Sequence, residues 1–581
     1  MRKTKIICTM GPATDTDSIV KEMILNGMNV ARFNFSHDVH DVHKKRSDLV
    51  KKVRKVLNKP IALLLDTKGP EIRTGEYEKG SIDLLEGALF TLKCEECVGN
   101  ESCVSINYID LYKDVKVGDS ILVDDGLIEL IVSDIKGKDI ICKVANSGKL
   151  SNKKSINVPG VPIKLPYMND KDKQDVLFAI KNDFDFIAAS FVRNSTDLKI
   201  LRNFLDDNGG NFIKIISKIE NREGVENIEE IMRISDGIMI ARGDMGVEIP
   251  FEELPAIQKR IISLCNKAGK PVITATQMLD SMIKNPRPTR AEITDVANAI
   301  YDGTSAIMLS AETSIGKYPV EVIKTMSKIA LSTESNINYE KRFRNLSVDN
   351  NPNITTAISH ATCSAAHNLK AKTIITVTKS GHTARMISKY RPDCEIVAPT
   401  ISEKVFYQLA ISWGVIPIMT QEKTSTDEIL DQAVERSLED KYVKNGDLVI
   451  LTGGFPSGMS GTTNILKVHI VGDVLLRATG ANNLAASGTI FVAKEELKSM
   501  SEFNRGDILV LSKTTKTIIP LLKAASAIIT EEDDPQSQAV LVGMALDIPV
   551  LYNASDATEI LKSGTIATVD SGKGEVSKGI R

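Results

Sequence analysis

Eight short apolar runs dominate the first 310 residues, and each run ends in a cluster of polar residues. The runs are Lys5 to Thr9, Asn29 to Phe33, Ile61 to Asp66, Asp185 to Ser190, Phe212 to Ser217, Gly237 to Arg242, Pro271 to Thr276 and Ala306 to Ser310. Helical patterns separate most neighbouring runs, which predicts parallel strands joined by crossover helices. Eight such units predict a (β/α)8 TIM barrel, an α/β fold whose active site lies at the carboxyl ends of the strands.

The length and charge of the chain limit the other possibilities. With 581 residues, the chain is expected to form roughly four domains of about 150 residues each. Lysine and arginine (73) nearly balance aspartate and glutamate (75), so the bulk charge favours no nucleic-acid or membrane-surface partner. The sequence shows no apolar core of a signal peptide and no apolar stretch approaching ~20 residues. We therefore expect a cytoplasmic protein.

Changes of pattern divide the chain into four predicted domains. The barrel takes residues 1–69 and 167–338. Between them, residues 70–166 show short alternating segments with glycine turns, which predicts a small inserted β-barrel placed as a lid over the catalytic face. Residues 339–472 alternate helices with apolar runs, which indicates an open α/β domain. Residues 473–581 are expected to form an extra C-terminal α/β domain.

Polar residues at the ends of the fifth and sixth strands form the strongest chemical pattern. Lys218 and Glu220 share one side of the fifth strand because side chains alternate with a period of two. Asp244 follows the sixth strand, and Gly243 before it allows a ligand to approach the backbone closely. Two hard carboxylates favour Mg²⁺ or Mn²⁺ over zinc. The alternative is a lysine held in a purely structural salt bridge.

The second, third and seventh strands add further candidate ligands. Arg32 and Arg73 suit a phosphoryl substrate, since guanidinium groups bind phosphate oxygens in pairs. Thr276 adds a hydroxyl at the end of the seventh strand. Four oxygen-bearing side chains with a single negative charge favour a monovalent cation: Asn34, Ser36, Asp66 and Thr67.

A glycine-containing loop after a predicted strand resembles an anion site. It lies directly before a predicted helix and consists of Thr378, Lys379, Ser380, Gly381, His382 and Thr383. Backbone amides at a helix start, together with hydroxyl groups, bind anions readily. An ordinary turn between a strand and a helix is the alternative. The sequence contains no Walker loop, so metal and cationic side chains would have to hold nucleotide phosphates.

Two further groups have the composition of metal sites but not the spacing. Three cysteines lack a fourth zinc ligand nearby, which favours reduced thiols; they are Cys94, Cys97 and Cys103. Three histidines follow one another at three-residue spacing, which favours a solvated helix face; they are His37, His40 and His43.

Several long motifs resemble the pyruvate kinase family. They include "LLDTKGPEIRTG" at Leu64, "IISKIENREG" at Ile215, "MIARGDMGVEIP" at Met239 and "TATQMLDSM" at Thr274. The resemblance covers about the first 470 residues. It implies an allosteric glycolytic homotetramer that transfers a phosphoryl group from phosphoenolpyruvate to ADP and yields pyruvate and ATP.

The resemblance also implies roles for individual residues. Lys218 would neutralise charge on the transferred phosphoryl group, while Glu220 and Asp244 would hold Mg²⁺ or Mn²⁺. Phosphoenolpyruvate would contact Arg32, Gly243, Asp244 and Thr276, and the nucleotide would contact Asn34, Arg73 and Lys154. K⁺ would be bound by Asn34, Ser36, Asp66 and Thr67. A phosphorylated effector would bind to residues 378–383. Ser155 departs from the glycine expected after Lys154. In this family, glutamate at position 71 accompanies K⁺ dependence, whereas members with lysine there manage without the ion.

The last segment resembles the mobile phosphohistidine domain of phosphoenolpyruvate-using enzymes. Carriers of that type have a Thr-Ser-His motif, and the matching residues here are Gln536, Ser537 and Gln538. An amide cannot form a phosphohistidine, so we expect no carrier function.

Two other functions compete with the kinase. A Mg²⁺-dependent barrel aldolase acting on pyruvate also needs paired carboxylates and an arginine, but it does not require Arg73, Lys154 or a K⁺ cage. A non-enzymatic sugar-phosphate sensor would work through residues 378–383. The intact set of Lys218, Glu220 and Asp244 argues against the sensor.

Overall fold

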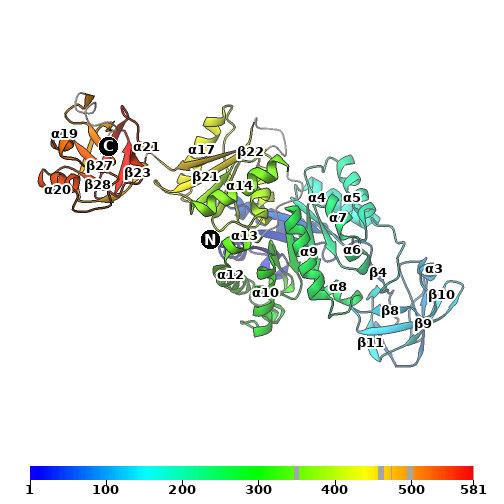
Figure 1. Ribbon diagram of the computed structural model, residues 1–581. Helices are drawn as coiled ribbons and strands as arrows, with labels where there is room; N and C mark the ends of the chain where they lie inside the picture. Colours follow the sequence, from blue (N-terminus) through cyan, green and yellow to red (C-terminus); the bar gives the residue numbers. More distant parts are fainter. Residues whose placement is uncertain (346–352, 456–462, 473, 494–501, 580–581) are drawn as a thin grey trace. The chain divides into compact units, whose positions relative to one another are not determined.

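The computed structural model describes residues 1–345, 353–455, 463–472, 474–493 and 502–579 (Figure 1). The chain forms two compact units. The first consists of residues 1–360, 376–422 and 453–464, and the second of residues 361–375, 423–452 and 465–581. None of the helices in the described ranges is long and apolar enough to cross a membrane.

Eight parallel strands close into a barrel, which confirms the predicted fold class. The strands are β1 (Lys5–Thr9), β2 (Val30–Asn34), β3 (Ala62–Asp66), β13 (Phe186–Ala189), β14 (Lys214–Ile219), β15 (Gly237–Ala241), β16 (Val272–Ala275) and β17 (Ala306–Leu309). Their order around the barrel is β1-β17-β16-β15-β14-β13-β3-β2. Each strand lies within two residues of its predicted run at both ends because both sides of a barrel strand are buried, which gives a continuous apolar signal.

Crossover helices connect the barrel strands. The principal ones are α1 (Asp17–Leu25), α2 (His40–Val56), α4 (Asp170–Lys181), α5 (Ser195–Asp207), α7 (Ile228–Ile234), α9 (Leu254–Ala268), α10 (Arg290–Asp302) and α12 (Pro319–Ser335). Residues at the helix ends themselves determine where these helices begin and stop. Asn169 and Thr289 form capping boxes at the starts of α4 and α10, and Gly269 and Gly303 end α9 and α10 in the left-handed conformation that glycine favours.

The segment between β3 and β13 forms a separate β structure with its own apolar core. A seven-stranded sheet has the order β4-β12-β8-β9-β10-β6-β7, and β11 pairs with β5. These strands are β4 (Ile72–Arg73), β5 (Ser81–Leu84), β6 (Leu89–Lys93), β7 (Cys103–Ser105), β8 (Ser120–Val123), β9 (Ile128–Lys136), β10 (Asp139–Val144), β11 (Gly148–Ser151) and β12 (Ser155–Asn157). The short helix α3 (Leu111–Asp114) precedes β8.

An α/β region follows the barrel. Its five-stranded sheet has the order β20-β19-β18-β21-β22. The elements are α13 (Tyr339–Arg344), α14 (Ile354–Asn368), β18 (Thr373–Thr376), α15 (His382–Lys389), β19 (Glu395–Thr400), α16 (Glu403–Gln408), β20 (Val415–Met419), α17 (Thr426–Glu439), β21 (Leu448–Gly454) and β22 (Thr463–Ile470).

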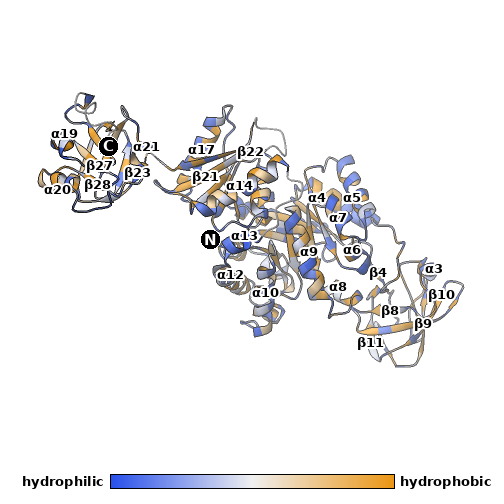
Figure 2. Ribbon diagram, in the orientation of Figure 1, coloured by the Kyte–Doolittle hydropathy of each residue, from blue (hydrophilic) through white to orange (hydrophobic). Residues whose placement is uncertain are grey.

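The C-terminal part forms an eight-stranded sheet of order β23-β30-β29-β25-β26-β27-β28-β24. Its elements are β23 (Val474–Arg477), β24 (Thr479–Gly480), β25 (Ala485–Val492), β26 (Ile508–Leu511), α19 (Ile519–Ala524), β27 (Ala527–Thr530), α20 (Gln538–Ala545), β28 (Val550–Tyr552), α21 (Ala557–Ile560), β29 (Ile566–Asp570) and β30 (Glu575–Lys578). Figure 2 shows apolar residues along β27 and β28, and every residue of β26 and β27 is buried. These central strands confirm an α/β fold for the segment.

The prediction of a solvated histidine face on α2 was wrong for His43. His43 is 2% exposed, and its ring stacks on Phe35 with the ring centroids 4.1 Å apart. The His43 Nε2 atom lies 2.8 Å from the His37 carbonyl oxygen. Burial lowers the pKa of His43, so this ring serves as a neutral core residue. His40 meets Asp175 at 2.6 Å.

Candidate active site

Buried charges form a continuous chain at the carboxyl ends of β2, β3 and β14. Arg32 Nε donates to Asp66 Oδ2 at 2.6 Å, and Arg32 Nη1 donates to the Thr9 hydroxyl at 2.9 Å. Lys218 Nζ lies 3.1 Å from Asp66 Oδ1 and 2.9 Å from Glu220 Oε1. Adjacent parallel strands end at one face, so residues from positions 32 to 220 meet there.

Ser190 connects this chain of charges, and sequence reasoning missed its role. Lys218 Nζ donates to Ser190 Oγ at 2.8 Å. Ser190 Oγ in turn lies 3.2 Å from Asp66 Oδ1 and 2.7 Å from the Thr67 carbonyl oxygen. The next residue, Phe191, donates its backbone N–H to Glu220 Oε2 at 2.6 Å. The available signal was that Ser190 ends the fourth apolar run.

The charges in this cluster set one another's protonation. Burial raises the pKa of Asp66, but Arg32 and Lys218 outweigh it and hold that pKa below its usual range. For Lys218, burial opposes the charge, yet Asp66, Glu220 and Asp244 together raise its pKa. The ammonium is therefore fully charged at neutral pH, as a group that stabilises phosphoryl oxygens must be.

The ends of β15 and β16 are held together in a strained conformation. Gly243 donates its backbone N–H to the Thr276 hydroxyl at 2.8 Å. Thr276 and Gln277 adopt φ values of 68° and 51°, which are costly for side chains of this kind. Arg242 donates to the carbonyl oxygens of Ala275 and Thr276 at 3.2 and 2.8 Å. These bonds fix where the Thr276 hydroxyl lies.

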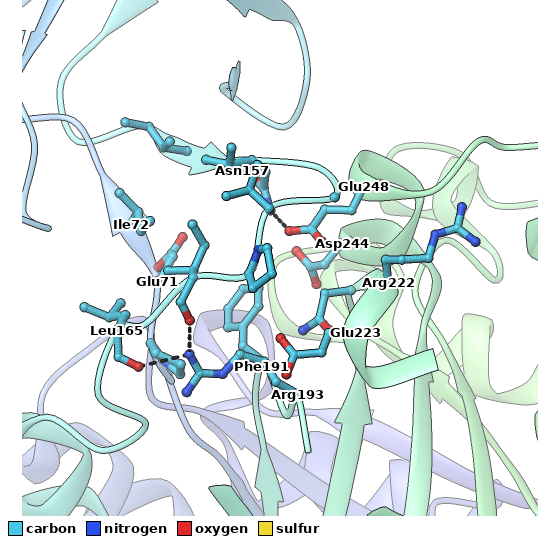
Figure 3. A pocket seen from close by; sticks show the side chains of 18 of the residues that line it. Glu71, Ile72, Asn157, Leu165, Phe191, Arg193, Arg222, Glu223, Asp244 and Glu248 are labelled. Carbon is cyan, nitrogen blue, oxygen red and sulfur yellow. Dashed lines mark hydrogen bonds between the residues drawn. The ribbon is translucent and has the colours of Figure 1, made fainter. Parts of the chain in front are cut away.

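A cavity of about 430 Å³ adjoins this face (Figure 3). Its walls come from the inserted β structure, including Glu71 and Asn157, and from the barrel, including Asp244 and Arg193. Arg193 Nη1 donates to the Ile163 and Leu165 carbonyl oxygens at 2.6 and 3.0 Å, which fastens the returning connection of the insertion to the barrel. The volume is in the range of sites for small molecules and cofactors.

Glu220 and Asp244 have the chemistry that a divalent cation requires. Glu220 is buried, and its Oε1 atom lies 2.9 Å from the Lys218 ammonium; each carboxylate oxygen has two lone pairs, so one stays available to a cation. Asp244 lines the cavity beside it, and both carboxylates act electrostatically on Lys218. Within the described ranges, no group of three or more acidic, histidine or cysteine side chains surrounds a single point. Two carboxylates with open positions suit Mg²⁺ bound together with substrate oxygens.

Comparison with known proteins identifies the family. Residues 1–323 match the family described as "Pyruvate kinase, barrel domain", and residues 356–469 match "Pyruvate kinase, alpha/beta domain". The chain belongs to the pyruvate kinase family. Residues 503–574 match "PEP-utilising enzyme, mobile domain". The chain is accordingly a kinase, an enzyme that transfers a phosphoryl group.

Individual pyruvate kinases are similar over the whole chain. The enzymes of Sporosarcina psychrophila and Geobacillus stearothermophilus are each 47% identical, over 100% of this chain and 99% of theirs. That of Staphylococcus aureus strain MRSA252 is 46% identical with the same coverage. The crystal structure of a pyruvate kinase from Cryptosporidium parvum superimposes with a TM-score of 0.77 at 41% identity, covering 81% of this chain and 96% of that chain.

The two predicted nucleotide-binding cations of the pyruvate kinase insertion are paired with acids. Arg73 Nη2 lies 2.6 Å from Glu71 Oε1, and Arg73 Nε donates to Glu71 Oε2 at 2.8 Å. Lys154 Nζ lies 2.8 Å from Asp124 Oδ1. Neither ion pair includes a residue of the Lys218 cluster. Ser155, at the unexpected position after Lys154, lines the cavity.

The four predicted K⁺ ligands of the pyruvate kinase fold lie at the ends of β2 and β3. Asn34 and Asp66 are register partners, and Asn34 Oδ1 accepts the Ser36 backbone N–H at 3.1 Å. The Thr67 hydroxyl lies 3.3 Å from the Ala188 carbonyl oxygen. All four side chains offer oxygen atoms, which fits K⁺, although Asp66 also serves Arg32 and Lys218.

The predicted effector loop lies apart from the barrel residues, between β18 and α15. Thr378 Oγ1 accepts the Gly381 backbone N–H at 2.9 Å, and Gly381 has a φ of 78°. Thr383 Oγ1 lies 2.9 Å from Thr463 Oγ1. Lys379 and Ser380 are exposed, whereas Thr378 and Thr383 are buried.

In the last domain, Ser537 caps α20, so Gln538 occupies the first position of that helix.

Proposed function

We propose that this kinase transfers the phosphoryl group of phosphoenolpyruvate to ADP and yields pyruvate and ATP, the last step of glycolysis. The observation that carries the proposal is Lys218, a buried and fully charged ammonium placed between Asp66 and Glu220. Asp244, which acts on it electrostatically, lines a cavity of about 430 Å³. Phosphoryl transfer is catalysed mainly by positioning and charge stabilisation, and these residues supply both.

Each side chain has a distinct role in this mechanism. Arg32, held by Asp66, binds phosphoryl oxygens, and Lys218 neutralises the charge that spreads over the group in flight. Gly243 leaves room for substrate against the backbone, and Thr276 stands near the carbon that is protonated. Glu220 and Asp244 would hold Mg²⁺ or Mn²⁺, which when bound neutralises phosphate and enolate oxygens.

The nucleotide and K⁺ would use the oxygens and cations beside this cluster. We assign Asn34, Arg73 and Lys154 to the nucleotide, and Asn34, Ser36, Asp66 and Thr67 to K⁺. For Arg73 and Lys154, binding then requires exchange of Glu71 and Asp124 for phosphate oxygens, which guanidinium and ammonium groups bind readily.

A coupled assay tests the proposed reaction. The protein is supplied with phosphoenolpyruvate, ADP, Mg²⁺ and K⁺, and pyruvate is detected by NADH consumption with lactate dehydrogenase. We expect pyruvate to form in equal amount to ATP. Turnover of pyruvate with an aldehyde, without a requirement for ADP, would instead indicate the aldolase. Absence of turnover together with sugar-phosphate binding would indicate the sensor.

Asp244→Asn is expected to raise the Mg²⁺ concentration needed for half-maximal activity by roughly tenfold or more, since one charged ligand of the cation is lost. The measurement is the coupled assay over a Mg²⁺ series. Glu252→Gln, which alters an exposed carboxylate just beyond the same region, is the control and should leave the requirement unchanged. An unaltered Mg²⁺ curve for Asp244→Asn contradicts the assignment.

Residues 378–383 are proposed to bind a phosphorylated effector that shifts the substrate response. The support is the helix start at His382 with an exposed lysine and hydroxyl before it. Ser380→Asp places a negative charge where the phosphate would lie. We expect it to abolish activation by sugar phosphates and AMP while leaving unactivated turnover intact. Activation equal to that of the parent protein shows that the site lies elsewhere.

The last domain is expected to carry no phosphate, because Gln538 replaces the histidine that a carrier needs. Incubation with radiolabelled phosphoenolpyruvate should leave no acid-labile label on it. A chain ending after about residue 472 should keep the reaction while its stability or regulation changes. A folded truncation without kinase activity overturns this view of the domain.

The remaining assignments concern organisation. We propose domain boundaries at residues 1–69 with 167–338, 70–166, 339–472 and 473–581, supported by the separate sheets of the structure. We further propose a homotetramer acting in the cytoplasm, in keeping with a glycolytic role. Analytical ultracentrifugation of the full chain measures the oligomeric state.

A further inference from the structure

A small cavity at the amino-terminal end of the barrel strands is lined by cationic side chains. It lies where α15 packs against the segments that lead into β16 and β17, remote from the Lys218 cluster. Its lining includes Lys270, Arg385, Lys389 and Arg391. No carboxylate is among its lining residues in the described part of the chain. Like charges gathered at one place repel one another, and a bound anion offsets that repulsion.

Arg391 is the residue whose charge is least satisfied. It is 5% exposed, and its Nη2 atom donates to Asn266 Oδ1, the Gly303 carbonyl oxygen and Ser305 Oγ at 2.8, 2.9 and 3.1 Å. Its Nε and Nη1 atoms are buried and have no hydrogen-bond partner in the described part of the chain. Burial, with repulsion from Arg342, lowers the pKa of Arg391 to about 9.

The surrounding groups do not compensate this charge. Among the described residues, no carboxylate lies within ion-pair distance of Arg391. Glu334, the acid that acts on it electrostatically, accepts the backbone N–H groups of Lys3 and Thr4 at 2.8 and 2.6 Å. The Trp413 ring centroid lies 4.6 Å from Arg391 Cζ. An aromatic face attracts a cation but neutralises no net charge and leaves the Nε and Nη1 donors unused.

The cavity is small, and its volume of about 20 Å³ admits a particle at least as large as a water molecule. A monatomic anion enters such a space without any change in the walls, and the unpartnered N–H groups of Arg391 offer it a donor. We propose that this cavity binds one monatomic halide anion, of which chloride is the physiological example, between the Arg391 guanidinium and the neighbouring cations.

Trp413 provides a direct readout because it is the one tryptophan in the 581 residues and lines the cavity. The full chain is titrated with sodium chloride, or with sodium bromide as a heavier probe, and sodium gluconate keeps the ionic strength constant. We expect a saturable change of tryptophan emission with chloride and saturable quenching with bromide. Chloride should reverse the bromide effect by competition.

Variants assign the effect to the cavity. Arg391→Gln is expected to lower the apparent halide affinity at least tenfold, and Arg391→Lys should retain more of it. Arg260→Gln removes an exposed charge from α9, the helix that carries Asn266, and should behave as the parent. An emission change that stays linear in halide concentration, or that survives unaltered in Arg391→Gln, overturns the proposal and leaves a buried water as the occupant.

A diffraction measurement decides the question if Arg391→Gln fails to fold. Crystals of the unmutated full chain grown in bromide are measured at the bromine absorption edge. We expect an anomalous peak in the cavity within hydrogen-bond distance of Arg391 Nε or Nη1. Absence of that peak at bromide concentrations that saturate the emission change overturns the site.

Discussion

Replacement of Lys218 by alanine is expected to lower kcat by roughly 10³- to 10⁵-fold, the range seen when a cation that stabilises a phosphoryl transition state is lost. The KM for phosphoenolpyruvate should change much less, because the charge is needed mainly in the transition state. Coupled assays of the variant and the parent under saturating Mg²⁺ and K⁺ give both constants.

The structure adds a stability cost to this variant. Lys218 is buried against Asp66 and Glu220, and removal of one member of a buried ion pair costs about 3–5 kcal/mol. Thermal unfolding must therefore be measured alongside activity, and the assay run well below the transition. Lys214→Ala is the matched control, since Lys214 lies at the other end of β14 and pairs with half-exposed Asp236 at 3.1 Å. Near-normal turnover in folded Lys218→Ala removes this lysine from the mechanism.

Omission of K⁺ is expected to reduce activity at least tenfold in a Tris-buffered assay, with much weaker restoration by Na⁺ than by K⁺. The reason lies in Glu71. Its carboxylate oxygens contact Nε and Nη2 of Arg73 and so offset the positive charge of that arginine. Substrate oxygens then need another cation nearby. At an effective dielectric constant near 20, one charge at about 4 Å changes the energy by roughly 4 kcal/mol before screening.

Glu71→Lys is expected to make the enzyme partly independent of K⁺, because an ammonium then supplies the missing charge. Glu71→Gln is the matched control: it removes the carboxylate without adding a cation and should remain K⁺-dependent. The measurement is the ratio of activities with and without roughly 0.1 M KCl, an ionic strength at which the Debye length is about 10 Å. Equal activity of the parent protein with and without KCl would contradict the predicted K⁺ dependence.

Local sequence patterns were sufficient to predict the barrel and the residues of its candidate site. Continuous apolar runs and helix caps depend on residues close together in the chain, so β14 and β15 could be placed from their own sequences. The positions of Lys218 and Glu220 followed from strand periodicity and those of Gly243 and Asp244 from the end of a strand. Gln538 alone was enough to exclude a phosphohistidine, since that conclusion depends on the chemistry of one side chain.

The partners of these residues were decided only by the tertiary structure. Ser190 joins Lys218 to Asp66 across three strands, and His43 became a core residue because Phe35 packs on it. Arg391 gives no signal in the sequence that separates it from a surface arginine, yet it is buried, and no carboxylate among the described residues pairs with it. Sequence patterns record which face of an element is buried. Which side chain meets which depends on packing between different segments, as for Ser190 and Asp66, which are 124 residues apart, and that packing decides the charge balance of each site.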